Sequence, residues 1–141
     1  MKFDIKINKV AQSKVSQVDL DNVIMGFNFT DHMFVCDYEN GQWNNPRIEP
    51  LELIPTHPAA MALHYGQAIF EGMKATLGKD GTALLFRPIE NAKRFNHSAD
   101  RLGMPLVPED LFVEALKQFT ALEKNWIPSK VGSALYIRPF M

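Results

Sequence analysis

The sequence predicts an α+β fold, in which a mainly antiparallel sheet packs against two helices. Segments 31–43 and 69–89 each combine apolar residues with a short turn sequence, which is typical of β-hairpins. Two later segments carry apolar residues at steps of three and four, which is typical of amphipathic helices. Hairpins followed by helices, rather than strands and helices in alternation, favour an antiparallel sheet.

The strands are expected in three parts of the chain. Residues 3–10 alternate apolar and polar side chains, and the Asn-Gly pair at 40–41 tolerates the positive φ of a tight hairpin turn. Four prolines within 46–58 exclude a helix there, so that segment is expected to be extended. The second hairpin is expected to turn at 78–81, and residues 133–141 predict the last strand.

Two helices are expected between the second hairpin and the last strand. The first, 90–103, ends at a glycine that is followed by Pro105, a combination that stops a helix. The second, 108–128, begins at a proline followed by two acidic residues, which suit the positive end of the helix dipole.

The composition narrows the class of protein. The 141 residues carry a net charge of −1, so we expect one ordinary domain without the basic excess of a nucleic-acid-binding protein. No apolar run is long enough to span a bilayer, and the N-terminus lacks the apolar core of a secretory signal. We therefore expect a cytoplasmic protein with neither nucleic acid nor a membrane as a partner.

The sequence does not indicate a metal or nucleotide site. The four histidines have no paired ligand spacing, and Cys36 is the one cysteine. The GxGxxG, P-loop and Gly-x-Ser-x-Gly patterns are all missing from the sequence.

The chain ends at Met141 inside an apolar predicted strand, without a polar tail. Such an element needs partners that bury its side chains. We therefore expect residues 1–141 to be the small N-terminal domain of a longer protein, cut off from a C-terminal domain. The apolar surface that this cut exposes is expected to make the piece self-associate.

One face of the first predicted helix collects positive charge. Arg94, His97 and Arg101 are three and four residues apart, and Arg87 lies just before the helix. Such a face binds a phosphate through charge-assisted hydrogen bonds or is simply solvated, and the spacing alone leaves both interpretations open.

The aromatic residues Tyr65, Phe70 and Tyr136 line an apolar pocket or belong to the core, and composition leaves both interpretations open. Tyr136 and Arg138 are two residues apart in a predicted strand, so they share a face. A charge on a buried face needs a partner, and a substrate carboxylate would provide one.

Four sequence blocks follow one another from about residue 20 to the end of the chain. They are TDHMF at 30–34, LHYGQAIFEGMKA at 63–75, LFRPIENAKRF at 85–95 and LYIRP at 135–139. Together they resemble the branched-chain amino-acid aminotransferases, which are fold-type IV pyridoxal-phosphate enzymes. The first block and its spacing to the second resemble this subgroup more than the D-amino-acid aminotransferases or aminodeoxychorismate lyases of the same fold.

The resemblance implies a role for each matched residue. Arg94 matches the arginine that binds the 5′-phosphate of pyridoxal phosphate. Tyr65 and Phe70 match residues that line the substrate pocket, and the tyrosine is implied to reach the active site of a partner subunit. Tyr136 and Arg138 match a strand pair beside the substrate, where the arginine is implied to recognise a carboxylate.

Two positions depart from the family pattern. Met25 stands where some members have a phenylalanine in the wall of the substrate pocket. Lys74 does not match the lysine that holds the cofactor as a Schiff base, and that lysine is implied to lie beyond residue 141. No catalytic residue is therefore assigned within this chain.

The resemblance implies that the full-length enzyme moves the amino group of leucine, isoleucine or valine to 2-oxoglutarate, as a homodimer or higher homo-oligomer in amino-acid biosynthesis. The isolated piece is expected to be inactive. Two alternatives stay open: a binding or assembly module without chemistry, and a related enzyme of the same fold, either a D-amino-acid aminotransferase or an aminodeoxychorismate lyase.

Overall fold

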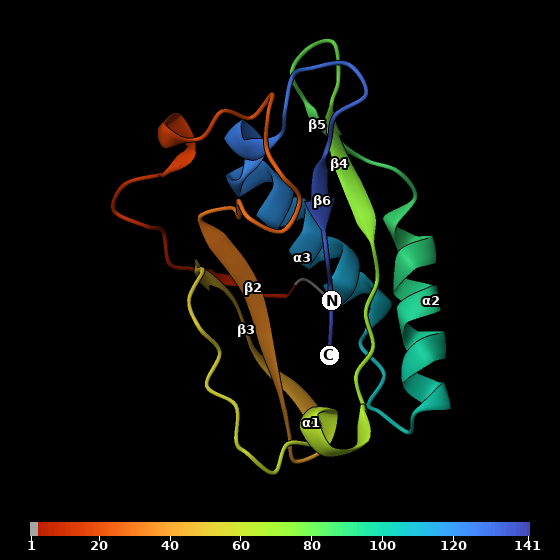
Figure 1. The fold of residues 1–141 in the computed structure, drawn as a ribbon. Coiled ribbons are helices and arrows are strands. Elements are labelled where there is room, and N and C mark those ends of the chain that lie inside the picture. The colour runs from red at the N-terminus through yellow and green to blue at the C-terminus, as the bar shows by residue number, and fades with distance from the viewer. Residues whose placement is uncertain (1–2) are drawn as a thin grey trace.

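A computed structural model describes residues 3–141, which form two three-stranded sheets and three α-helices (Figure 1). The first sheet has the order β1-β3-β2, with strands at Lys6–Ile7 (β1), His32–Glu39 (β2) and Gln42–Pro50 (β3). The predicted hairpin is confirmed: β2 and β3 are antiparallel and join at Asn40 and Gly41, which have φ values of 53° and 79°. Strand β1 is far shorter than predicted and pairs with β3 in parallel.

The second sheet has the order β5-β4-β6, and its strands are all antiparallel. They lie at Met73–Leu77 (β4), Ala83–Leu85 (β5) and Leu135–Ile137 (β6). Strand β6 is shorter than the predicted 133–141, because Pro139 has no N–H to donate to a neighbouring strand. Pairing nevertheless continues beyond it: Ile69 and Met141 exchange backbone hydrogen bonds of 2.9 and 3.0 Å, and the Glu71 N–H donates to the Pro139 carbonyl.

The three helices are α1 at Met61–Tyr65, α2 at Pro88–Arg101 and α3 at Glu109–Leu122. Helices α2 and α3 confirm the two predicted helices. Helix α3 is shorter than predicted because Ile127, which precedes Pro128, is disfavoured in a helix. A 3₁₀ turn at Lys124–Trp126 follows it instead. The five-residue helix α1 was not predicted.

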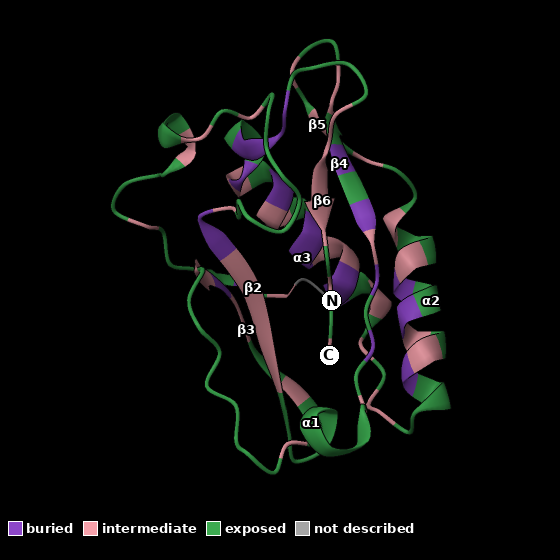
Figure 2. Cartoon of the chain, in the orientation of Figure 1, coloured by how far each residue is buried: buried purple, intermediate pink, exposed green. Residues whose placement is uncertain are grey.

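Helix α3 lies between the two sheets and contributes to both parts of the core (Figure 1). Phe112 and Leu116 pack against α2 and the second sheet, and the rings of Phe95 and Phe112 have centroids 5.6 Å apart. Leu111 and Ala115 face the first sheet and join Ile5 and Ile48. Figure 2 shows the buried residues along α2 and α3 on the sides that face the sheets. Among residues 3–141, no helix is long and apolar enough to cross a membrane.

Candidate functional site

Residues 70–74 separate two groups of predicted site residues. Glu71 and Met73 are buried, whereas Phe70 and Lys74 are exposed. Because side chains alternate between the faces of an extended segment, Glu71 and Met73 point towards α2, whereas Phe70 points to the open face of the sheet.

The open face brings three of the predicted residues together. Arg138 Nη2 donates a hydrogen bond to Tyr136 Oη at 2.9 Å. The guanidinium carbon of Arg138 lies 4.6 Å from the Phe70 ring centroid and 5.3 Å from the Tyr136 ring centroid. Within the described residues, Arg138 forms no ion pair, so its charge lies against two aromatic rings, and the donors not bonded to Tyr136 stay available to an acidic ligand.

Gly72 makes room for this group. A Cβ atom at Gly72 would lie 2.5 Å from Tyr136 Oη, closer than real Cβ contacts allow. The register pairs Lys74 with Tyr136, so the tyrosine ring leans along the sheet over the neighbouring even-numbered position. The glycine is therefore required by the position of the tyrosine and not by a special φ value.

Arg94 lies on the other side of this segment, on α2. Its Nε donates to Glu71 Oε1 at 2.6 Å, and its Nη2 donates to Glu71 Oε2. Asn91 Nδ2 donates to the same Oε2 at 2.9 Å. The hydrogen bonds from Arg94 outweigh the effect of burial and lower the pKa of the Glu71 carboxyl, and Glu71 raises the pKa of the Arg94 guanidinium.

A hollow of about 330 Å³ lies between α2 and the start of β4. It forms because β5 pairs only with the later part of β4, so the edge at 72–74 is left without a neighbouring strand. Three cations and one exposed acid share the lining, together with uncharged residues: Arg94, Arg87, Lys74, Glu90, Gly72, Met73, Phe86 and Asn91. This set of donors fits a phosphate group, because cationic N–H donors are the usual partners of phosphate oxygens.

The remaining predicted residues lie elsewhere. Tyr65, in α1, and Met25, in the loop before β2, are both largely exposed. Neither lines the hollow, and neither belongs to the contacts among Phe70, Tyr136 and Arg138. His97 and Arg101 are exposed on α2 beyond the hollow. The structure thus gathers one group on the open face and separates it from Arg94.

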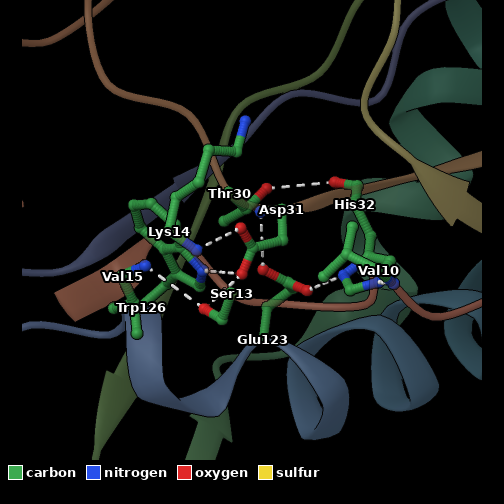
Figure 3. Close-up of polar contacts among 9 residues, drawn as sticks. All are labelled: Val10, Ser13, Lys14, Val15, Thr30, Asp31, His32, Glu123 and Trp126. Carbon is green, nitrogen blue, oxygen red and sulfur yellow. Dashed lines mark hydrogen bonds and ion pairs between the residues drawn. The ribbon is translucent and has the colours of Figure 1, made fainter. Parts of the chain in front are cut away.

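Sequence reasoning missed a buried polar cluster at the end of α3 (Figure 3). Glu123, 2% exposed, accepts hydrogen bonds from the Asp31 N–H at 3.1 Å and from His32 Nδ1. The Val10 N–H donates to His32 Nε2 at 3.0 Å, so the imidazole carries its proton on Nδ1. Burial raises the pKa of Glu123, and the hydrogen bond from His32 opposes that rise.

Asp31 extends this cluster to the N-terminal segment. Its carboxylate accepts from Ser13 Oγ at 2.5 Å and from the Lys14 N–H and Trp126 Nε1, both at 2.9 Å. Burial opposes ionisation, but these hydrogen bonds together lower the pKa of Asp31. The only sequence signal was the TDHMF block, which does not reveal a partner 92 residues away. Within the described residues, no group of three or more histidines, cysteines or acids is placed to bind a metal ion.

No family model matches the chain, but a comparison with known proteins finds relatives that carry the same kind of name. The chain is 49% identical over 124 residues to "Branched-chain-amino-acid transaminase 1" of Bacillus subtilis (strain 168), which is 87% of this chain and 35% of that protein. It is 46% identical over 134 residues to "Branched-chain-amino-acid aminotransferase 2" of the same organism, which is 94% of this chain and 37% of that protein.

A relative from another organism is similar over the whole chain. The "Branched-chain-amino-acid aminotransferase" of Mycolicibacterium smegmatis is 40% identical over 144 residues, which is 100% of this chain and 39% of that protein. The chain thus spans 35–39% of the length of these relatives. By sequence, the chain belongs to the family of branched-chain-amino-acid aminotransferases.

Proposed function

We propose that the protein that carries this chain is a pyridoxal-phosphate-dependent aminotransferase, which moves the amino group of leucine, isoleucine or valine to 2-oxoglutarate. The observation that carries the proposal is the position of Arg94. Its guanidinium is held at one edge by a buried acid and lines a hollow with two further cations, in a chain whose relatives are named as branched-chain aminotransferases.

In this proposal, Arg94 binds the phosphate of the cofactor, and Arg87 and Lys74 add positive potential. A guanidinium suits this task because its planar fork of N–H groups matches two phosphate oxygens. When bound, pyridoxal phosphate supplies the electron sink that stabilises negative charge at the α-carbon of the amino acid. Lys74 is not assigned as the covalent attachment point, which the proposal places elsewhere in the full-length protein.

The group on the open face is proposed to bind the substrate. Arg138 recognises a carboxylate, while Phe70 and the Tyr136 ring enclose a branched aliphatic side chain. Burying such a side chain contributes roughly 1.5–3 kcal/mol and leaves polar side chains without hydrogen-bond partners. Tyr65 and Met25, exposed and away from this group, suit contacts across a subunit boundary, so a homodimer is part of the proposal.

The test uses the full-length protein with added pyridoxal phosphate. Transfer of amino groups to 2-oxoglutarate is measured with leucine, isoleucine and valine, and with D-alanine for comparison. We expect transfer from the three branched substrates and little from D-alanine. Preference for D-alanine would favour the D-amino-acid enzyme of the same fold. No transfer and no visible absorbance from bound cofactor would favour the binding or assembly module.

A further inference from the structure

A buried carboxylate lies directly behind the guanidinium that we propose as the phosphate-binding group. Glu71 is 5% exposed, whereas the Arg94 side chain is 63% exposed. A negative charge this close to an anion site repels the anion. Coulomb interactions alone therefore do not account for an acid at this position.

The hydrogen bonds give the acid a geometric role. A guanidinium has five N–H groups in a planar fork, and Glu71 occupies one edge of it through Nε and Nη2. The opposite edge, Nη1 and the outer hydrogen of Nη2, keeps its donors. Because the fork is rigid, fixing one edge also fixes the direction in which the other edge points.

Asn91 also orients the Glu71 carboxylate, through a hydrogen bond. It lies one helical turn before Arg94 on α2, and its amide donates to Glu71 Oε2 at 2.9 Å. Glu71 is in turn anchored through its backbone, because its N–H donates to the Pro139 carbonyl at 2.8 Å. The long arginine side chain is thus tied to the sheet rather than left free in solvent.

We propose that Glu71 is the positioning residue for Arg94. It holds one edge of the guanidinium so that the other edge is already oriented to bind two oxygens of a phosphate monoester. This inference rests on the proposed function, because it takes Arg94 as the group that binds the cofactor phosphate. Asn91 supports it by orienting the carboxylate.

The substitution Glu71→Gln in the full-length protein separates charge from position. Removing a negative charge near a phosphate tightens binding if only Coulomb interactions matter. Loss of the oriented pair of charge-assisted hydrogen bonds weakens binding instead, and we expect a loss of roughly tenfold. The two effects have opposite signs, so the direction of the change decides between them.

Glu90→Gln is the matched control. Glu90 also lines the hollow, but its carboxylate pairs with Arg87 at 3.8 Å and Lys93 at 3.3 Å and does not touch Arg94. This substitution removes the same charge from the same hollow, so we expect it to tighten phosphate binding slightly. A loss with Glu90→Gln equal to that with Glu71→Gln would overturn the inference.

The measurement compares two probes on the protein freed of cofactor: pyridoxal 5′-phosphate and pyridoxal, which lacks the phosphate. Dissociation constants come from fluorescence titration, and thermal unfolding checks that each variant folds. We expect Glu71→Gln to weaken binding of the phosphorylated probe by roughly tenfold and of pyridoxal by less than about twofold. Equal losses for both probes would mean a merely structural role and would overturn the inference.

Asn91→Ala provides a second variant if Glu71→Gln fails to fold. It removes the hydrogen bond that orients Glu71 and leaves the ion pair with Arg94 in place. We expect a loss of roughly threefold for the phosphorylated probe alone, the loss of one modest hydrogen bond. An unchanged affinity for that probe would count against the inference.

Arg94→Lys separates failure of this inference from failure of the proposed function. If this variant binds pyridoxal 5′-phosphate as well as the parent protein, the proposed phosphate site itself is wrong. If Arg94→Lys weakens binding and Glu71→Gln does not, only the positioning role is wrong. In the Arg94→Lys background, Glu71→Gln is expected to cause no further loss, and additive losses would overturn the inference.

Discussion

At the scale of single residues, the candidate site depends on groups that lie very close to one another. Glu71 binds Arg94 across 23 positions of sequence, and Tyr136 lies over Gly72. Strand alternation predicts that Tyr136 and Arg138 share a face, and the structure confirms it. It does not predict that a glutamate occupies a buried position, because the compensating charge comes from a helix later in the chain.

Gly72→Ala is expected to displace the Tyr136 ring, because the new methyl group would lie 2.5 Å from its hydroxyl oxygen. The ring is on the open face and can move, so the unfolding free energy should fall by only about 1–3 kcal/mol. For the activity proposed above, KM of the full-length protein for branched-chain substrates should rise. Tyr136→Phe removes the closest atom and should reduce the stability loss from Gly72→Ala, as measured by urea denaturation. If Gly72→Ala lowers the unfolding free energy by the same amount in the Tyr136→Phe variant, the clash is not with the Tyr136 hydroxyl.

The ion pair of Glu71 predicts a pH dependence of stability. Its pKa in the folded state is lowered, so its contribution is complete above the unfolded-state pKa of roughly 4.3 and is lost as the pH falls through the folded-state pKa. Because the Arg94 side chain is 63% exposed, solvent screening keeps the effect of this ion pair on stability small. Urea denaturation from pH 7 downwards should show the difference between the parent and Glu71→Gln disappearing in acid. A difference that persists at the lowest pH would exclude the charge as its source.

At the scale of elements, the two hairpins and the two long helices were predictable, because their turn residues and apolar spacing are local signals. Helix α1 was not, since five exposed residues carry no periodicity. The parallel pairing of β1 with β3 depends on a partner about 40 residues away, which no local pattern encodes. The cluster at the end of α3 has the same origin, because its acid and its donors come from distant segments.

Glu123→Ala is expected to destabilise this junction strongly. It leaves the Asp31 N–H and His32 Nδ1–H buried without acceptors, which should lower the unfolding free energy by about 3 kcal/mol. Glu114→Ala, within α3, removes an acid whose partner is a nearby glutamine, and it should lower the unfolding free energy by less than about 0.5 kcal/mol. Chemical denaturation compares the two variants, and equal losses would argue against a role for the cluster.

At the scale of the whole molecule, many large apolar side chains are exposed. They include Ile24, Phe27, Leu53, Leu63 and Phe86. Large apolar surfaces seek burial in water, so we predict that the 16.0 kDa chain studied alone forms larger species as its concentration rises. Sedimentation velocity over a concentration series measures this. A single monomeric species at every concentration would show that these side chains tolerate water.

Because side chains alternate along residues 70–74, the arrangement of the site depends on the number of residues in this segment. Glu71, which binds Arg94, and Phe70, which contacts Arg138, lie on opposite faces of this stretch. Inserting one residue just before Phe70 would exchange the two faces, turning the glutamate to the solvent and the phenylalanine towards α2. Inserting two residues would return each side chain to its original face of the segment. An alignment of related sequences should therefore show insertions or deletions just before Phe70 in multiples of two residues.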